Sequence, residues 1–273
     1  MSRSGVRDIV LLTLGWEDLP RSVSVEGAPE HERLREPVPG VLLLCDGGWL
    51  LLDTGFNTAL LHDPALRRRF HGDPSSRAIL PGPGEPLYEA LVHAGIAMDE
   101  VHAVGLSHLH LDHVGGLRHF VGRPVHCQRR ELEFGLTDEA EQHAIYRIDF
   151  DDPRHDWRLA DGDVEIAPGV TAVLTAGHTP GHQSFVVDVD DSVGGGGLVL
   201  AFDAADLAAE NIDQELPIGG RVHATPEECV EQVRRLKSIA AARGYPLVPG
   251  HDPLVWPALT RETAERFGRA PAR

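Results

Sequence analysis

Short apolar runs, separated by turns rich in Gly, Pro and Asp, dominate the hydrophobic pattern of this chain. The clearest hairpin joins residues 41–45 to residues 49–53 through Asp46-Gly47-Gly48. Each run has the length and apolar character typical of a buried strand. The pattern predicts further strands over residues 8–14, 101–106, 124–128, 164–166, 170–175, 184–189, 198–202 and 245–248.

Helical spacing is clearest after Thr225. Thr225 is a good cap, Pro226 suits the first helical position and Glu228 completes a capping box, so we expect a helix that ends near Gly244. The spacing also predicts helices over residues 85–94 and 129–134, and a helix start near Val114. Two polar or Gly- and Pro-rich stretches, residues 15–39 and 56–83, show no clear period and are expected to be irregular. Residues 137–160 are polar with scattered aromatic residues and form either a substrate-facing insertion or a surface excursion.

Strands, a helix and a strand with polar residues at its end occur once before residue 125 and again after residue 164. This repeat predicts an α/β fold made of two similar halves, whose strand ends meet at one edge. A chain of 273 residues can form one large domain or two small ones, and we expect residues 1–273 to form one.

Charge and hydropathy disfavour some classes of binding partner. With 25 basic and 42 acidic residues the formal charge is −17, which disfavours nucleic acid as a partner. No window approaches the ~18 apolar residues of a membrane span, and no signal peptide is visible. Cys45, Cys127 and Cys229 are widely spaced, as buried free thiols would be. We therefore expect a cytoplasmic enzyme or binding protein without a membrane partner.

The first candidate metal ligands follow directly after the predicted strand 101–106. They are His108, His110, Asp112 and His113. In an extended segment His108 and His110 point to the same side and can bind one divalent cation together. Asp112 and His113 follow where the chain turns into a helix and can face a second cation. The alternative is a His-rich surface loop in a chain with 16 histidines.

Three later residues could complete such a site: His178, Asp203 and His251. Each follows an apolar strand, although each alone would more often be an ordinary turn or strand-end residue. With the first loop they supply three groups for each of two metals and one shared carboxylate, which leaves open positions typical of catalytic sites. Asp53, at the end of a strand, is either a turn residue or a carboxylate that orients a metal-bound histidine.

These motifs, with Asp53-Thr54-Gly55 and the stretch from Gly177 to Ser184, resemble the metallo-β-lactamase superfamily and, within it, the N-acyl homoserine lactone lactonases. The resemblance implies a four-layer αβ/βα sandwich with two Zn²⁺ at one edge, or other divalent metals such as Fe, Co or Mn. One metal would be bound by His108, His110 and His178, the other by Asp112, His113 and His251, with Asp203 bridging both.

The implied reaction is lactone ring opening by a hydroxide shared between the metals, on a small-molecule substrate. Asp112 would carry a proton, Asp53 and His182 would orient imidazoles, and Phe70 would form one wall of the acyl groove. We expect a monomer or homodimer. One departure is Asp206, which stands where these lactonases usually have a tyrosine that contacts the substrate carbonyl, and an acid donates a hydrogen bond only when protonated.

Several alternatives stay open at this point. The substrate could be another lactone or ester, such as a pyridoxal-derived lactone, and the same metals could hydrolyse thioesters or phosphodiesters. A metal-binding protein without catalytic activity is a further possibility.

Overall fold

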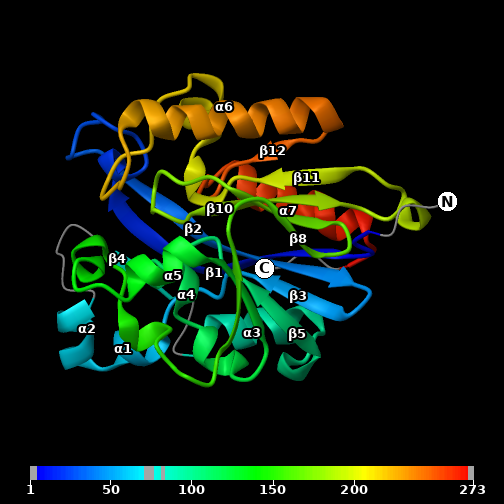
Figure 1. The fold of residues 1–273 in the computed structure, drawn as a ribbon, viewed down its shortest axis with the longest axis horizontal. Coiled ribbons are helices and arrows are strands. Elements are labelled where there is room, and N and C mark those ends of the chain that lie inside the picture. The colour runs from blue at the N-terminus through cyan, green and yellow to red at the C-terminus, as the bar shows by residue number, and fades with distance from the viewer. Residues whose placement is uncertain (1–4, 71–76, 81–83, 270–273) are drawn as a thin grey trace.

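Two mixed β-sheets pack face to face, and helices cover their outer faces (Figure 1). The computed structural model describes residues 5–70, 77–80 and 84–269. The first sheet has the order β4-β1-β2-β3-β5-β6-β7, with β1 (Ile9–Pro20), β2 (Arg33–Cys45), β3 (Gly48–Leu52), β4 (Arg77–Ile79), β5 (Val101–Gly105), β6 (Pro124–Gln128) and β7 (Asp156–Ala160). The second has the order β12-β11-β10-β9-β8, with β8 (Val164–Ala167), β9 (Val170–Leu174), β10 (Gln183–Asp188), β11 (Gly197–Leu200) and β12 (Leu247–Val248).

The helices lie on two sides of the sheet pair. In Figure 1, α6 extends along one outer face beside β11 and β12, whereas α1 to α5 lie on the opposite side. Their bounds are α1 (Thr58–His62), α2 (Pro64–Phe70), α3 (Pro86–Ala94), α4 (Leu111–Val114), α5 (Arg129–Gly135), α6 (Pro226–Arg243) and α7 (Val255–Arg266). Among the described residues, no helix has the length and apolar character needed to cross a membrane.

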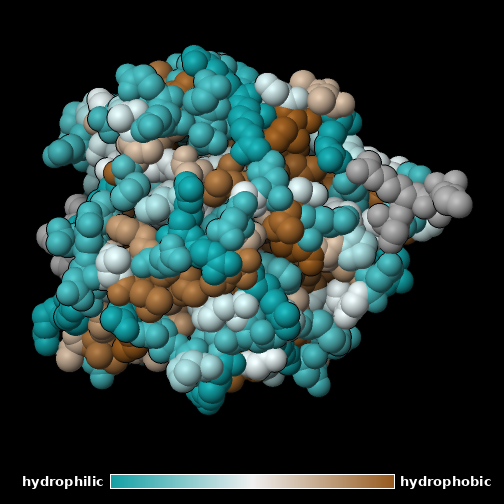
Figure 2. All heavy atoms as spheres, in the orientation of Figure 1, coloured by the Kyte–Doolittle hydropathy of each residue, from teal (hydrophilic) through white to brown (hydrophobic). Residues whose placement is uncertain are grey.

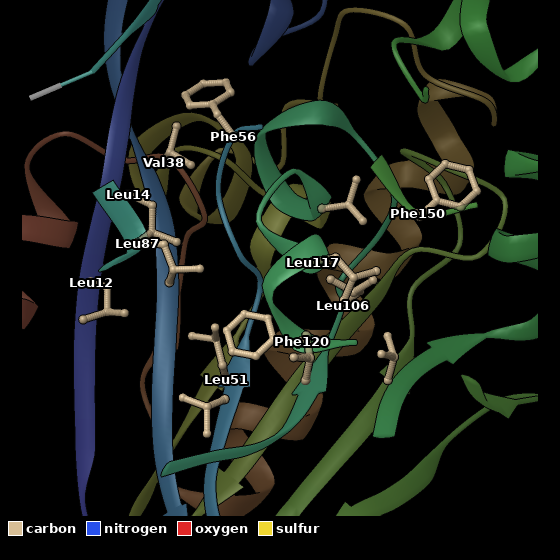
Figure 3. Close-up of a cluster of buried hydrophobic side chains, with 14 of the residues drawn as sticks. Leu12, Leu14, Val38, Leu51, Phe56, Leu87, Leu106, Leu117, Phe120 and Phe150 are labelled. Atoms are coloured by element: carbon tan, nitrogen blue, oxygen red, sulfur yellow. The ribbon is translucent and has the colours of Figure 1, made fainter. Parts of the chain in front are cut away.

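The strand period of two explains why the fold has layers. Successive side chains of a strand point to opposite faces. Leu51 of β3 therefore packs under the helices of the first sheet, whereas Leu50 packs between the sheets. In the second sheet, Phe185 faces the first sheet and Val186 faces α6. Figure 3 shows the core under the helices, which includes Leu12, Leu14, Leu51, Leu87, Leu117 and Phe120.

The expected α/β sandwich is confirmed, as are most of its elements. The Thr225 hydroxyl accepts from the Glu228 amide, and α6 ends at Gly244 in the left-handed conformation. Helix α3 likewise ends at a left-handed Gly95. The predicted hairpin is the antiparallel β2–β3 pair. Helix α7 has no counterpart in the sequence predictions.

The prediction of an irregular stretch over residues 15–39 is wrong. Strand β1 continues to Pro20 and β2 already begins at Arg33, and the two form one long antiparallel pair. A register shift between Thr13 and Trp16 interrupts the alternation, and two acidic residues, Glu17 and Glu36, are buried in it. Because the apolar pattern is broken at these points, the strand is not recognisable in the sequence.

Two further stretches differ from expectation. The helix expected near Val114 begins earlier, at Leu111, and ends at Val114. Residues 56–83 contain α1, α2 and β4, while residues 71–76 and 81–83 lie outside the described residues. Figure 2 shows that hydrophilic residues cover most of one face of the molecule, interrupted by patches of hydrophobic residues.

We predict that Gly115→Ala destabilises the fold. A Cβ at Gly115 would lie 1.9 Å from the amide nitrogen of Asn57 and 2.3 Å from the carbonyl carbon of Phe56, and neither backbone atom can move alone. We expect the free energy of unfolding in urea to fall by about 2 kcal/mol or more. Gly47→Ala is the control, because a Cβ there meets nothing within 4 Å. Equal unfolding midpoints for both variants would contradict the close approach.

Candidate metal centre

The first histidine loop follows β5, a central parallel strand of the first sheet. The amide of Ser107 donates to Asp53 Oδ1 at 2.7 Å, and the carbonyl of Ser107 accepts from the Gln183 amide of the second sheet at 2.8 Å. The loop is thus fixed to both sheets where their strands end. Helix α4 begins directly afterwards and carries Asp112 and His113.

The seven side chains expected to bind metal come together at this edge. They come from the ends of different strands: His108 and His110 follow β5, His178 follows β9, Asp203 follows β11 and His251 follows β12. The donor atoms form two clusters, and within each cluster all of them lie within 4.8 Å of one another. One cluster consists of His108, His110, His178 and Asp203, the other of Asp112, His113 and His251.

The first set surrounds one point. Nε2 of His108 and Nε2 of His178 each lie 2.9 Å from Nδ1 of His110. Oδ2 of Asp203 lies 3.7 Å from the His108 nitrogen and 3.3 Å from the His178 nitrogen. Donors about 2.0–2.1 Å from a tetrahedral Zn²⁺ are separated by about 3.3 Å, so these spacings suit one such ion.

The second set uses the other oxygen of the same aspartate. Oδ1 of Asp203 lies 3.3 Å from Nε2 of His113 and 3.2 Å from Nε2 of His251. Oδ2 of Asp112 lies 2.9 Å from the His113 nitrogen and 3.9 Å from the His251 nitrogen. Asp203 therefore presents one oxygen to each set.

Hydrogen bonding alone does not account for these contacts. Nδ1 of His110 faces two imidazole nitrogens, but a neutral imidazole nitrogen can share only one proton or one lone pair. Nε2 of His113 is buried and makes no hydrogen bond, although two carboxylate oxygens lie close to it. Both observations fit ligands that point at a common cation.

The buried carboxylates of the site also require positive charge close to them. Burial opposes ionisation of Asp203, but His113, His251 and His108 hold the pKa of its carboxyl well below the usual value. Burial also opposes the charge on His113, yet Asp112, Asp203 and Asp53 raise its pKa well above the usual value. Burial and the charge on His113 instead lower the pKa of His108. A divalent cation would supply the charge that these carboxylates otherwise obtain from imidazole protons.

Asp53 contacts His113 of the second set at the ring nitrogen that does not face the other ligands. It is fully buried, and its Oδ2 lies 2.7 Å from Nδ1 of His113 and accepts from the Ser107 hydroxyl at 2.6 Å. A hydrogen bond to Nδ1 leaves Nε2 of His113 free as a ligand and fixes the ring. Of the two readings of Asp53 from sequence, this contact favours the one that orients a histidine.

His182 lies differently from expectation. Its ring packs beside the His108 ring, with centroids 5.2 Å apart, but its Nδ1 contacts the Thr175 hydroxyl at 2.9 Å. No hydrogen bond to a ligand imidazole is present among the described residues. His182 can restrain His108 by packing only.

Sequence reasoning missed Glu131, a buried residue of α5. Its Oε1 accepts from the Leu109 amide at 3.0 Å, and its Oε2 accepts from the Gly181 amide at 2.8 Å. It therefore joins the loops that carry His108, His110 and His178. Burial raises the pKa of Glu131 to about 7. In the sequence, this residue is one acidic position in a polar helix and gives no signal.

A cavity of about 340 Å³ opens onto the two sets. Phe70 lines it, as expected, and its ring packs edge-to-face on Tyr146 with centroids 4.9 Å apart. Asp206 lines it as well and is only 4% exposed. Burial and the charge of Asp203 raise the pKa of Asp206 well above its usual value. Burial likewise raises the pKa of two further lining residues, Glu17 and Glu36.

The chain belongs to the metallo-beta-lactamase superfamily, whose family model matches residues 37–193. Together with the fold and the two donor sets, this match defines a hydrolase of the metallo-beta-lactamase type with a divalent-metal site at this edge. The family expected from the sequence motifs is thereby confirmed.

Its relatives include several lactonases. An N-acyl homoserine lactonase of Bacillus thuringiensis is 32% identical over 221 residues, which is 80% of this chain and 82% of that protein. The N-acyl homoserine lactonase AttM of Azorhizobium caulinodans is 32% identical over 82% of this chain and 85% of its own length. A solved N-acyl homoserine lactone hydrolase with N-hexanoyl-L-homoserine at its catalytic metal center matches with a TM-score of 0.79 and 26% identity, covering 91% of this chain and 94% of that chain.

We predict that Asp53→Ala weakens metal binding. Without the carboxylate, Nδ1 of His113 loses its 2.7 Å contact and keeps only the Ser107 hydroxyl at 3.5 Å, so the ring is held less firmly. We expect metal affinity to fall by about 10- to 100-fold, measured by competition with a chromogenic chelator. Asp138→Ala, at an exposed position, is the control and should leave affinity unchanged. Equal affinity of the Asp53 variant and the wild type would show that the contact does not support the site.

Proposed function

We propose that this chain opens the lactone ring of N-acyl homoserine lactones at a centre of two zinc ions. The observation that carries the proposal is the arrangement of seven donors in two sets that share Asp203. The lactonase relatives support it, because they match the chain over about four fifths of its length. We also expect the enzyme to act in the cytoplasm, as a monomer or homodimer.

The donor types favour zinc. Imidazole nitrogens with carboxylate oxygens suit Zn²⁺, and Fe, Co or Mn could bind the same groups. His108, His110 and His178 would hold one ion, and Asp112, His113 and His251 the other, with Asp203 between them. When bound, two such ions supply hydroxide at neutral pH and polarise an ester carbonyl.

Asp112 is the residue to which we assign proton transfer. It lines the cavity beside His113, and its position beside the reacting ester would let it reach the ring oxygen that leaves. Burial opposes its ionisation, but His113 and His251 lower the pKa of its carboxyl below the usual value. The carboxylate is therefore ready to accept the proton released as the carbonyl is attacked and to pass it to the leaving oxygen.

Substrate position would be set by the cavity wall. Phe70, Leu19 and Val23 give an apolar surface against which an acyl chain can pack. We assign to Asp206 the contact with the substrate carbonyl. With its pKa raised by burial, the Asp206 carboxyl can retain a proton and donate the hydrogen bond that a tyrosine would otherwise provide.

We predict that His110→Ala abolishes ring opening and lowers the metal content. Its Nδ1 lies next to both other histidines of the first set, so its loss leaves that ion with too few ligands. We expect kcat/KM, measured by pH-stat, to fall by more than the roughly hundredfold seen when only an outer contact to a ligand is lost. His62→Ala, an exposed histidine of α1, is the control.

Retained hydrolysis in the His110 variant would overturn the assignment. Two metals per wild-type chain with no turnover of acyl homoserine lactones of any length would point to another lactone or ester, such as a pyridoxal-derived lactone. Chromogenic thioesters and phosphodiesters test the remaining reactions of the same centre.

A further inference from the structure

We propose that three carboxyl groups in the cavity wall form a subsite for a positively charged group on the substrate. The three are Glu17, Glu36 and Asp206, and all line the cavity. The subsite rests on the proposed function. Its substrates would be homoserine lactones with a short acyl chain that carries an ammonium group.

Glu17 and Glu36 stand directly opposite each other. Glu17 lies on β1 and Glu36 on β2, and the register of the antiparallel pair makes them partners across the strands. They are 8% and 1% exposed. Like charges in directly opposed positions destabilise a sheet, and buried charges without a counterion cost more. Burial raises the pKa of both carboxyls, and a cationic ligand that donates to them would offset the cost of their ionisation.

Asp206 adds an acceptor to this wall, because a protonated carboxyl that donates from one oxygen can still accept a hydrogen bond at the other. Its Oδ1 is buried and has no hydrogen-bond partner, and the residue is 96% shielded from solvent. The neighbouring Ser24 hydroxyl donates to Glu36 Oε1 at 2.5 Å and has no second proton to give. A buried acceptor without a donor is costly, and the residue that carries this one lines the cavity.

Arginine side chains near the cavity have other partners or none of the three carboxyls as a partner. In the part of the chain that the structure describes, no ion pair joins any of the three to lysine or arginine. Arg21, at the end of the same strand pair, instead contacts Glu32 and Glu210. Arg69, which also lines the cavity, pairs with Glu141. The charge of His251 favours ionisation of all three carboxyls, and an ammonium group bound in the cavity would add hydrogen-bond donors that His251 does not supply.

The subsite begins next to the reacting centre. The ligand atoms of Asp206, Asp203 and His251 lie within 4.8 Å of one another. A substrate whose carbonyl lies at the metal centre would thus bring only the first few atoms of its acyl group to the three carboxyls. An ammonium group at that distance can donate to them, whereas an alkyl chain would bury them without partners.

Matched substrates test this directly. Three pairs of L-homoserine lactones differ only in a terminal methyl or ammonium group: N-propanoyl and N-glycyl, N-butanoyl and N-β-alanyl, and N-pentanoyl and N-(4-aminobutanoyl). We measure kcat and KM for each on the zinc-loaded enzyme, below the pKa of the amines. In at least one pair we expect the ammonium compound to be preferred by about tenfold or more in kcat/KM, chiefly through KM.

Glu17→Gln and Glu36→Gln keep the shape of the wall and remove its charge. Each should reduce the ammonium preference by about tenfold, measured as the ratio of kcat/KM within a pair, because a general effect on activity cancels in that ratio. Glu30→Gln, at an exposed position between the same two strands, is the control and should keep the wild-type preference. Preference for alkyl chains in every pair, or an unchanged preference in both variants, would overturn the proposal.

Two other outcomes are distinguishable. Loss of metal from Glu17→Gln or Glu36→Gln with the ammonium preference retained would show that these carboxyls only balance the charge of the metal centre, and would overturn the subsite. If no lactone is hydrolysed, the proposed function fails, and binding of the stable ring-opened compounds decides the inference. A larger rise in melting temperature with glycyl-homoserine than with propanoyl-homoserine supports the subsite, and an equal rise overturns it.

Discussion

The site depends on one buried carboxylate, Asp203, whose two oxygens face two different sets of nitrogens. A carboxylate in this position is stable only where positive charge lies on both sides of it. The protein meets that requirement with histidines from four other strand or helix boundaries, which explains why both sheets must end at the same edge. Two further carboxyl groups hold the ligands in place. Asp53 fixes the His113 imidazole, and Glu131 joins two of the loops that carry ligands.

This requirement also links the fold to the chemistry. The strands β5, β9, β11 and β12 lie in two separate sheets, and the interleaved apolar faces of those sheets hold their ends in register. The loops after these strands can then carry polar groups that would be costly to bury singly. A change that shifts one sheet against the other would separate the two donor sets, so the core between the sheets contributes to the site as well as to stability.

Much of this arrangement could be predicted from the sequence, for local reasons. His108, His110, Asp112 and His113 lie within six residues, so their shared location needs no knowledge of the fold. His178, Asp203 and His251 were identifiable because each follows an apolar strand. Glu17, Glu36 and Glu131 were not, because their burial results from packing between distant segments and leaves no local pattern. The start of β1 and the end of β2 are predictable, but their extension over residues 15–20 and 33–40 is not, because buried acids and a register shift obscure the alternation there.

In the proposed mechanism, hydrolysis requires a metal ion bound by each of the two donor sets. The most direct measurement is the rate of lactone ring opening as metal is added back to metal-free protein, with bound metal counted per chain. We expect a rate that stays low until the second equivalent binds and then reaches its maximum at two metals per chain. Full activity at one equivalent or fewer, or no activity at two, would contradict it.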